Sequence, residues 1–384
     1  MRASADLVIV GGGIIGCAAA WYAARAGLGV VLVERGGIAC ETTGAGMGHL
    51  MVQPRPQPLL ALTRESVRMW KALHAELGDF ALAATGILWL AEDAEDLRAL
   101  TACAQDFATQ GESVEMLTPE ELRAREPALA PDLAGGLACA ADAVVVPMQA
   151  AGALLRAARR HGAEVQTHTT ALALERGDRN QVEAVRTSRG RIATRAVVAA
   201  AGVFTPAFAA LAGLPGLAIV PRRGDLAVTA PETCPIRHQL LEVRYLQAAA
   251  PSGAGPDPGT CALNVQPQSR GTCLIGSTRQ FAGFAKAVAP ALLRRSLQRA
   301  ARFIPALLAA PIARTWAGLR PATPDRLPLV AAVPDVPGLF VAAGHEGLGI
   351  TLAPFTGALV AQLVQGAAVP PLARALGWRA AVLA

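Results

Sequence analysis

The sequence predicts a mixed α/β fold, α+β in part, in which an antiparallel-sheet domain is inserted into a doubly wound domain built from separate segments. Three observations predict it. The first 35 residues follow the order strand, glycine-rich turn, helix, strand. The C-terminal part contains a strand, a glycine-rich loop and a helix. The middle of the chain consists of short strand-like segments with Pro- and Gly-rich loops.

The N-terminal unit is the clearest of these segments. Residues 7–10 (Leu-Val-Ile-Val) form a continuous apolar run, which is typical of a parallel strand buried on both faces. Glycines at 11–13 end that strand, and residues 14–26 have the spacing of a helix that ends at Gly27. Residues 30–33 form a second buried strand, so the unit is a strand–helix–strand with a parallel pair.

The later elements follow from periodicity and from start and stop residues. We expect a helix that begins after Thr118 as N-cap with Pro119 in its first position, and helices at residues 59–77, 94–110, 149–161, 292–303 and 350–365. We expect short strands between 220 and 278, strands at 86–91, 165–167, 191–201 and 339–343, and loops at 42–48, 53–58 and 250–260. These elements place the doubly wound domain at residues 1–80, 142–218 and 318–384, and the antiparallel domain at 81–141 and 219–317.

Composition excludes several classes of protein. With 384 residues, 53% of them apolar and 17% charged, the chain is not disordered and is long enough for two joined domains. The net charge of +6 is spread without a block of Lys or Arg, so we expect no nucleic-acid partner. The seven cysteines form no Cys-x-x-Cys pair, and no set of His, Cys and acids has metal-site spacing. We therefore expect neither disulfides nor a metal.

Targeting signals are also missing from the sequence. The N-terminus shows no secretory signal, and no window of about twenty uninterrupted apolar residues indicates a transmembrane segment. We expect a cytoplasmic protein, peripheral to a membrane only through an electron acceptor.

A dinucleotide-binding pattern follows the first strand. Gly11-x-Gly13-x-x-Gly16 lies between a strand and a helix, where glycines allow a tight turn, close approach of a pyrophosphate and close helix–strand packing. The helix N-terminus adds free N–H groups and partial positive charge for the phosphates. Glu34 ends the second strand, where a carboxylate accepts ribose hydroxyls and disfavours a ribose phosphate. The pattern therefore favours FAD or NAD over NADP.

Two further loops favour FAD over NAD. The residues of the loop at 42–48 are small enough to let the backbone pass close to a flat ring system. Residues 342–350 form a second glycine-rich loop ahead of a helix, whose N-terminus would stabilise negative charge on a reduced flavin. No second GxGxxG pattern serves a nicotinamide cofactor, so the electrons come from an organic substrate.

These motifs resemble a known superfamily. The fingerprint, residues 316–321 (Trp-Ala-Gly-Leu-Arg-Pro) and the Gly344-His345 loop are similar to those of the D-amino-acid oxidase and glycine oxidase superfamily, and the likeness spans nearly the whole chain. The motifs that look closest to the FAD-carrying subunit of bacterial D-hydroxyproline dehydrogenases are residues 46–50, 237–240, 264–267, 276–281 and 344–350. The resemblance implies a Rossmann-type FAD-binding domain with an inserted substrate domain. It also implies non-covalent FAD, because no Cys lies in the C-terminal loop where sarcosine oxidases attach theirs.

The resemblance also implies roles for particular residues. Arg320 corresponds to the arginine that binds the substrate carboxylate, and a planar guanidinium suits a bidentate pair with a carboxylate. Further candidates for contact with the substrate or the reacting part of the flavin are His49, Tyr245, Asn264, Arg279, Gln280 and Glu346. The candidates for cofactor contact are Gly11, Gly13, Ile14, Ile15, Gly16, Glu34, Arg35, Thr42, Thr43, Gly46, Met47, Gly48, Ala171, Ala201, Gly202, Gly344, His345, Gly347, Leu348, Gly349, Ile350 and Thr351.

The sequence departs from the better-known relatives at two places. Glycine oxidases carry a second arginine where Gly347 stands, and D-amino-acid oxidases use tyrosines around the carboxylate. This chain has two tyrosines, of which Tyr22 lies on the first helix. Only Tyr245 is then available, with Asn264 as a substitute hydrogen-bond donor. These departures leave room for a substrate that has a polar group of its own.

We therefore expect oxidation of a small amino acid at its Cα–N bond by hydride transfer to flavin N5. The expected substrate is cis-4-hydroxy-D-proline or a D-proline-like compound, which yields a cyclic imine. Two alternatives stay open: a glycine, sarcosine or general D-amino-acid oxidase, and a flavin subunit of a multi-subunit electron-transfer complex that is inactive alone. In the second alternative, small iron–sulfur or other electron-accepting subunits accompany the chain, which has no cluster-binding cysteine pattern of its own.

Overall fold

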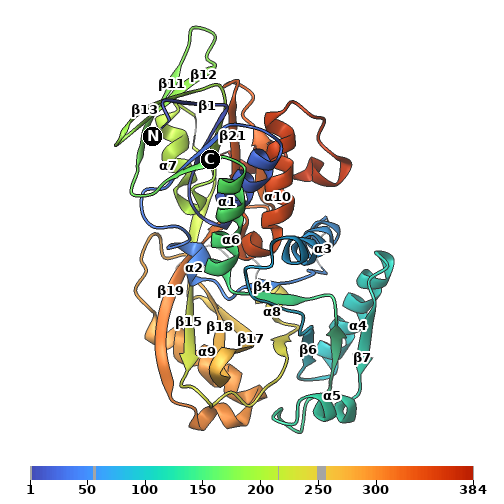
Figure 1. The fold of residues 1–384 in the computed structure, drawn as a ribbon. Coiled ribbons are helices and arrows are strands. Elements are labelled where there is room, and N and C mark those ends of the chain that lie inside the picture. Colours follow the sequence, from blue (N-terminus) through green and yellow to red (C-terminus); the bar gives the residue numbers. More distant parts are fainter. Residues whose placement is uncertain (1, 55–57, 215, 249–256, 384) are drawn as a thin grey trace.

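The computed structural model describes residues 2–54, 58–214, 216–248 and 257–383. A domain built on a parallel sheet occupies the upper part of Figure 1 together with both chain ends, and an antiparallel-sheet domain lies below it. Parts of the loops expected at 53–58 and 250–260 lie outside the described residues.

A six-stranded sheet forms the centre of the first domain. In spatial order its strands are β10 (Glu164–Gln166), β3 (Val30–Val33), β2 (Leu7–Val10), β14 (Val197–Ala199), β21 (Leu339–Ala343) and β20 (Leu329–Ala332). All neighbours are parallel except β20, which pairs antiparallel with β21. β2 and β3 contain only apolar residues because both faces of the sheet are covered.

The two faces of this sheet bury alternate residues of each strand. Leu7 and Ile9 pack on one face, which is covered by the helices α1 (Ile14–Arg25), α3 (Leu59–Leu77), α6 (Pro147–Arg160) and α10 (Gly349–Val364). Val8 and Val10 point to the other face. That face is covered by a four-stranded sheet in the order β1 (Ser4–Ala5), β13 (Gly190–Thr194), β12 (Val182–Thr187) and β11 (Ala171–Arg176).

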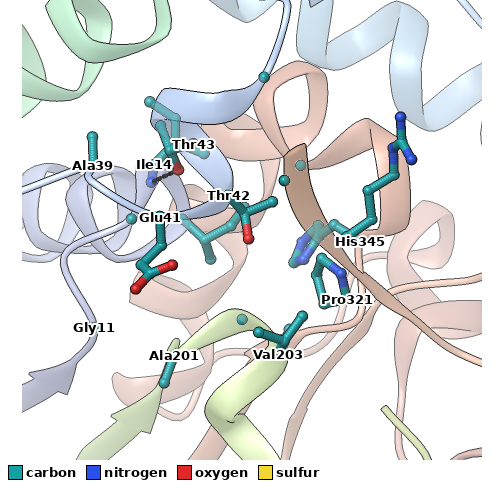
Figure 2. Close-up of a pocket in the computed structure, with 18 of the residues that line it drawn as sticks. Gly11, Ile14, Ala39, Glu41, Thr42, Thr43, Ala201, Val203, Pro321 and His345 are labelled. Atoms are coloured by element: carbon teal, nitrogen blue, oxygen red, sulfur yellow. Dashed lines mark hydrogen bonds between the residues drawn. The ribbon is translucent and has the colours of Figure 1, made fainter. Parts of the chain in front are cut away.

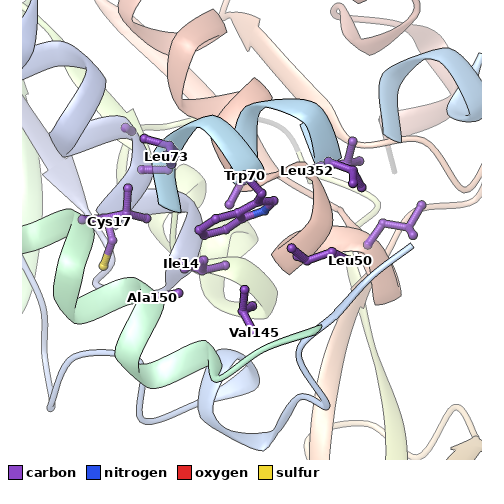
Figure 3. Packing of buried hydrophobic residues seen from close by; sticks show 14 of the residues in the cluster. Ile14, Cys17, Leu50, Trp70, Leu73, Val145, Ala150 and Leu352 are labelled. Carbon is purple, nitrogen blue, oxygen red and sulfur yellow. The ribbon is translucent and has the colours of Figure 1, made fainter. Parts of the chain in front are cut away.

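The helical side is anchored by Trp70 of α3, which lies among Ile14, Leu50 and Leu352 (Figure 3). Its side chain is fully buried, and Nε1 donates to the carbonyl oxygen of Ile350 at 2.9 Å. A buried indole N–H needs such a partner. The bond therefore fixes α3 against the N-terminal turn of α10.

The last helix is apolar on most of its surface. By length and composition, Glu346–Val364 would suffice to cross a membrane, but 61% of this window is buried inside the fold. Because α10 packs against α1 and α3, its apolar surface is that of a helix in the protein core.

An eight-stranded sheet forms the second domain. In spatial order its strands are β19 (Ile312–Ala322), β15 (Val220–Thr229), β18 (Thr272–Arg279), β17 (Thr260–Gln268), β16 (Gln239–Glu242), β6 (Ile87–Ala91), β8 (Gly135–Cys139) and β7 (Val114–Leu117). Neighbours are antiparallel except β16 and β6. Phe303 of α9 (Pro290–Phe303) packs with Val265 and Ile275 on one face.

The remaining elements include the small sheet β4 (His49–Leu50), β9 (Ala143–Val145) and β5 (Leu82–Ala83), and the short helices α5 (Pro119–Arg125), α7 (Thr205–Leu211) and α8 (Tyr245–Ala248).

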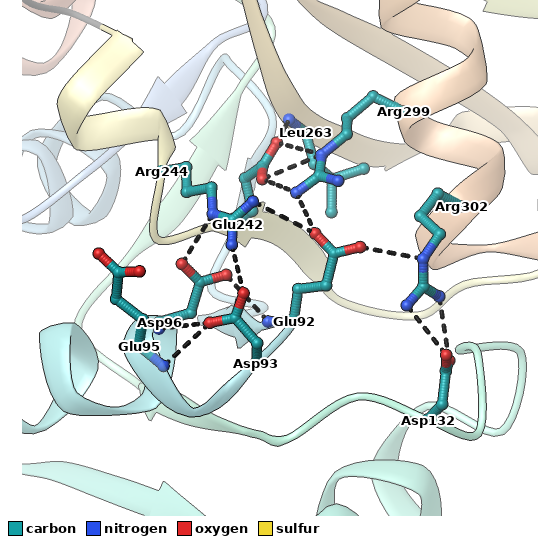
Figure 4. A network of polar contacts seen from close by, with 10 residues as sticks. All are labelled: Glu92, Asp93, Glu95, Asp96, Asp132, Glu242, Arg244, Leu263, Arg299 and Arg302. Carbon is teal, nitrogen blue, oxygen red and sulfur yellow. Dashed lines mark hydrogen bonds and ion pairs between the residues drawn. The ribbon is translucent and has the colours of Figure 1, made fainter.

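A charged network connects segment 81–141 to the rest of the second domain (Figure 4). Glu92, after β6, binds Arg299 of α9 at 2.6 Å and Arg302 at 2.9 Å. Arg299 also binds Glu242, which ends β16 and is 1% exposed. Arg244 continues the network to α4 (Ala94–Thr109) through Asp96. Because Glu242 is buried, removing Arg299 would leave an unpaired charge, so this pair holds β16 against α9, and Glu92 and Asp96 connect segment 81–141 to it.

Most expected elements are present within one or two residues, and the N-cap at Thr118 is confirmed by a capping box with Glu121. The strand expected at 191–201 is wrong, because β13 and β14 belong to different sheets. Between them the Thr194 side chain bonds the backbone of Ala196 and turns the chain. The loop expected at 42–48 contains a short helix, α2 (Thr42–Ala45). The boundary placed at residue 318 falls inside the continuous strand β19.

Candidate active site

A cavity of about 480 Å³ lies where the carboxyl ends of the parallel strands meet the antiparallel sheet (Figure 2). Val10 and Val33 end β2 and β3 at its wall, and Ala343 ends β21 there. From the other domain, β19 contributes Arg320 and β17 contributes Asn264. Ligands of doubly wound sheets bind at this edge, so the cavity is the candidate active site.

The glycine turn at one end of the cavity admits no side chain. Gly11 has a φ of +119°, and a Cβ there would lie 2.5 Å from the carbonyl oxygen of Ala200. A Cβ on Gly16 would lie 1.9 Å from the carbonyl oxygen of Gly11. The turn leads into α1, where the N–H of Ile14 donates to Oγ1 of Thr43 at 3.0 Å (Figure 2). The backbone thus reaches the cavity wall at a helix N-terminus, as a pyrophosphate requires.

Glu34 is held at the end of β3 by both carboxylate oxygens. Oε2 accepts a hydrogen bond from the N–H of Gly12 at 2.6 Å, and Oε1 accepts one from the N–H of Gly36 at 2.7 Å. A carboxylate has about four acceptor positions, so this fixed group can also accept hydroxyl donors from the cavity that it lines.

Aromatic and charged side chains close the cavity beyond Glu34. The guanidinium of Arg35 lies 3.7 Å from the ring centre of Phe204, and that ring stacks on Phe284 at 5.5 Å. Lys286 pairs with Glu41, which lines the cavity. The loop that carries Phe284 and Lys286 follows β18, so a segment of the second domain reaches this end of the cavity.

Strand β19 is fixed close to α2 at the middle of the cavity. Oγ1 of Thr42 donates to the carbonyl oxygen of Leu319 at 2.5 Å, and Nε1 of Trp316 donates to that of Ala45 at 3.2 Å. A Cβ on Gly318 would lie 2.8 Å from Cβ of Ala45. The small residues expected to let a flat ring pass therefore also bring the two domains together.

His345 and α10 form the opposite wall. His345 is 3% exposed, and its Nε2 lies 3.0 Å from Oγ1 of Thr356. Burial lowers the pKa of His345 to about 3, so the ring is neutral at physiological pH. The next residues, Glu346 to Gly349, lead directly into α10, whose N-terminus faces the cavity.

Arg320 lies on the wall formed by the antiparallel sheet. Its guanidinium lies over Gly224 of β15, where a Cβ would be 2.3 Å from Nη1. Among the residues that the structure describes, the one hydrogen bond of this guanidinium runs from Nη1 to the carbonyl oxygen of Thr278, at 3.0 Å. Burial lowers the pKa of Arg320, and Glu346 opposes that effect. Arg320 therefore presents a desolvated cation to the cavity.

The other predicted substrate residues occupy different positions. Tyr245 and Asn264 line the cavity beside Arg320, and Asn264 Oδ1 accepts from Gln239 at 3.0 Å. Arg279 does not line it: it is 2% exposed and lies behind Tyr245, with its guanidinium 4.3 Å from the ring centre. Gln280 also lies outside the lining, where its side chain bonds Asp257 and Arg223.

His49 lines the cavity, but its ring is bound to a buried acid. Nε2 lies 2.9 Å from Oδ2 of Asp142, which is 1% exposed. Oδ1 of Asp142 also accepts from the N–H of Val52 at 2.9 Å. Only Nδ1 of the ring is left for another partner. Asp142 gave no signal in the sequence, because it lies 93 positions from His49.

Each predicted cofactor residue lines the cavity except Gly16 and Gly344, which act through the backbone. Gly344 has a φ of +78°, and a Cβ there would lie 2.6 Å from the Thr323 side chain. Sequence reasoning did not name several other lining residues as candidates, among them Gly12, Ala39, Cys40, Glu41, Val203, Phe204, Gly224 and Leu226. Ser277 and Pro321 also line the cavity, inside the motifs at 276–281 and 316–321. Gly12 lies inside the glycine fingerprint and Glu41 directly precedes the loop at 42–48, so a fuller reading of those two motifs would have included both. Among the described residues, no group of three or more His, Cys, Asp or Glu side chains is placed to hold a metal ion.

Comparison with known proteins gives the family. The model described as FAD dependent oxidoreductase (DAO) matches residues 6–363. This chain belongs to that family of FAD-dependent oxidoreductases. Its cofactor is FAD, and it is a member of the amino-acid oxidase and dehydrogenase group of oxidoreductases.

The observed cavity fits FAD. The glycine turn and the α1 N-terminus supply the pyrophosphate site, and Glu34 supplies ribose acceptors. At Gly46 a Cβ would lie 2.9 Å from Cδ1 of Ile350, so the cavity is narrow where a flat ring has to pass. Arg320 lines the same cavity from strand β19, so a ligand of Arg320 would share the cavity with FAD.

The relatives of this FAD-dependent oxidoreductase are similar over nearly their whole length. Glycine oxidase of Geobacillus kaustophilus is 32% identical over 94% of this chain and 93% of its own. The crystal structure of that enzyme has a TM-score of 0.87 and covers 99% of both chains. Hydrogen cyanide synthase subunit HcnC of Pseudomonas aeruginosa is 29% identical over 96% of this chain and 94% of its own. L-Proline dehydrogenase of P. horikoshii has a TM-score of 0.87 at 24% identity, covering 97% and 96%, and supports the fold alone.

Proposed function

We propose that this FAD-dependent oxidoreductase holds the carboxylate of a small amino acid on Arg320 and oxidises its Cα–N bond. The observation that carries the proposal is the position of Arg320, at the cavity wall with a single described hydrogen bond to the chain. Each hydrogen bond between a guanidinium and a carboxylate contributes about 1.5–3 kcal/mol, so this side chain can fix the substrate by two bonds.

When bound, FAD would supply the two-electron acceptor for the hydride, which is the hydrogen of the Cα–H bond together with its electron pair. The contribution of the chain is placement. Arg320 holds one end of the substrate, while Leu226 and Leu348 exclude water from the space beside it. The amine has to be neutral to release its electrons, so the rate should rise with pH until the amine of the bound substrate is deprotonated.

Two substrate classes compete. The comparisons give better support to a glycine, sarcosine or general D-amino-acid oxidase, because the relatives include enzymes named glycine oxidase. The site supports cis-4-hydroxy-D-proline or a similar cyclic amino acid, because Glu346 adds a second polar position near Arg320. Glycine has no group for that position.

A subunit role is the alternative from another class. Two relatives are named as subunits, of hydrogen cyanide synthase and of opine oxidase. This favours a flavin subunit that passes electrons to a partner, including a small iron–sulfur protein. Copurification of a stoichiometric partner, together with slow reoxidation by oxygen and fast reoxidation by an artificial acceptor, would support that role.

The experiment that tests the proposal is anaerobic reduction of the purified yellow protein by a substrate panel. The panel contains cis-4-hydroxy-D-proline, D-proline, glycine, sarcosine and D-alanine. Bleaching by the cyclic compounds supports the hydroxyproline assignment, and bleaching by glycine or sarcosine alone moves the substrate to the oxidase class. Absence of bleaching by every amino acid, in the protein with its copurified partners, would reject amino-acid oxidation.

A further inference from the structure

Glu346 is held in an unusual backbone conformation at the cavity wall. Its φ is +46°, in the left-handed region that residues other than glycine rarely adopt. The side chain bends back so that Oε2 accepts from the N–H of Gly347 at 2.5 Å. Such a conformation costs about 1–3 kcal/mol and persists at sites where the surrounding structure enforces it.

Two buried arginines fix the other oxygen. Oε1 lies 3.6 Å from Nη1 of Arg222 and 3.9 Å from Nε of Arg279, and it accepts no hydrogen bond from the described part of the chain. Oε1 is enclosed, although 17% of the side chain is exposed. Glu346 lines the cavity, and the hydrogen bond from Gly347 to its Oε2 is on the exposed side. The arginines thus orient the carboxylate from behind.

The carboxylate is an anion and a weak base. Burial alone would raise the pKa of Glu346, but Arg279, Arg320 and Arg222 outweigh it and hold the pKa below its usual value. Other charges act in the same region: Asp257 raises the pKa of Arg222, Asp225 raises that of Arg320, and Glu346 raises that of Arg326. Glu346 therefore suits the role of hydrogen-bond acceptor better than that of general base.

An acceptor of this kind is poorly matched to the reacting amine. An anion beside the amine stabilises its protonated form, which cannot release the electron pair needed for oxidation. A hydroxyl group has no such conflict, because it donates a hydrogen bond to a carboxylate without changing its charge. The geometry therefore favours a hydroxyl donor on a part of the substrate away from the reacting bond.

We propose that Glu346 is a specificity-determining residue whose carboxylate accepts a hydrogen bond from a ring hydroxyl of the substrate, so that the site selects hydroxylated cyclic amino acids. The proposal rests on the proposed function, because Arg320 has to hold the substrate carboxylate nearby. A Cβ on Gly347 would lie 3.9 Å from Cδ of Arg320, so this loop lies against the carboxylate-binding side chain. Arg222 and Arg279 are positioning residues that act through Glu346.

Flavin reduction under anaerobic conditions tests the selectivity. The measured quantity is the ratio of kred/Kd for cis-4-hydroxy-D-proline to that for D-proline, in the holoenzyme. We expect Glu346→Ala to lower this ratio by about 10- to 100-fold, the effect of one hydrogen bond to a charged group. Glu346→Gln keeps an acceptor and should lower it less. The matched control is Glu41→Gln, the same substitution at a cavity-lining glutamate paired with Arg35 and Lys286, which should leave the ratio unchanged.

A binding measurement separates recognition from chemistry and stability. The probes are tetrahydrofuran-2-carboxylate and its 4-hydroxy derivative, which have no oxidisable amine, titrated calorimetrically into the holoenzyme. In the wild-type protein the hydroxyl should increase affinity, and Glu346→Ala should remove that increase alone. Equal affinity of the two probes in the wild type would overturn the proposal. So would an equal loss for both probes in Glu346→Ala, because a residue that only neutralises the arginines affects every ligand alike.

The same titration distinguishes this inference from the proposed function. If Arg320→Met weakens both probes while Glu346→Ala weakens them equally, the selectivity proposal fails and the carboxylate site stands. If Arg320→Met leaves both affinities unchanged, the proposed function itself fails, and the selectivity proposal fails with it. Arg279→Met should give an intermediate loss of the hydroxyl preference, because Glu346 remains but is held less firmly.

Discussion

Arg222 of β15 and Arg320 of β19 lie directly opposite each other on neighbouring strands. Like charges in opposed positions destabilise a sheet, and both side chains are largely removed from water. Burial lowers the pKa of Arg222 to about 10, because removal from water disfavours the charged guanidinium. A pair of cations kept together in this way is expected where the chain binds an anion.

Replacing Arg320 should therefore separate function from stability. We expect Arg320→Met to raise the KM for the amino acid at least about 100-fold, since two charge-assisted bonds of about 1.5–3 kcal/mol each are lost. The midpoint of thermal unfolding should change little, because the repulsion from Arg222 and the attraction to Glu346 are lost together. The control is Arg314→Met, on the exposed part of the same strand. A large fall in thermal stability with an unchanged KM would show that Arg320 is structural.

Gly224 should be needed for the position of that guanidinium. In Gly224→Ala the new Cβ would lie 2.3 Å from Nη1 of Arg320, so the side chain has to move. We expect KM to rise about tenfold, because a shift of about 1 Å in a binding group is enough to weaken substrate placement. Gly152→Ala, a helical site where the nearest atom is a flexible arginine at 3.1 Å, serves as the control for the substitution itself. A KM like that of the wild type would show that Arg320 has room to adjust.

Phe284 should slow the release of FAD. Its ring is 57% exposed on the loop after β18, yet it stacks on Phe204 at the cavity wall. An aromatic pair contributes about 0.5–1.5 kcal/mol, so Phe284→Ala should speed FAD dissociation about threefold to tenfold. The rise of free-flavin fluorescence after dilution measures it. Leu308→Ala, at an apolar side chain that is 79% exposed, should have no effect. Equal release rates in the wild type and Phe284→Ala would argue that the loop does not retain the cofactor.

His345 should make the fold sensitive to acid. Burial lowers the pKa of His345 from 6.5 to about 3, so between these pH values the side chain is protonated in the unfolded chain and neutral in the folded chain. The stability that depends on a neutral His345 is therefore fully present above pH 6.5, and the free energy of unfolding falls as the pH drops from 6.5 towards about 3. Urea titrations measure the free energy of unfolding at about pH 7.5 and about pH 5. Between these pH values it should fall by about 1–2 kcal/mol less in His345→Gln than in the wild type. Parallel pH profiles for the two proteins would contradict this assignment.

Local sequence was enough to predict the first unit of the fold and much of the cavity lining. β2, α1 and β3 follow from apolar runs and from glycines whose conformations only glycine adopts, and these signals lie within about 30 neighbouring residues. Arg320 was found through the resemblance of residues 316–321 to a known superfamily, and the C-terminal loop through its glycines. The exact substrate, the electron acceptor and any partner subunit depend on features that such motifs do not encode.

Other features were decided only when strands far apart in sequence were brought into register. Residues 191–201 have the apolar pattern of one strand, but β14 lies inside the six-stranded sheet between β2 and β21, whereas β13 belongs to the covering sheet. Nothing local distinguishes Arg222 from other arginines, or Gly224 from other glycines. Both become important because β15 pairs with β19, which puts Arg222 opposite Arg320 and opens space for a guanidinium over Gly224. The sequence by itself thus determined the cofactor fingerprint, whereas the tertiary structure decided which charges meet at the substrate, because strand register sets those distances.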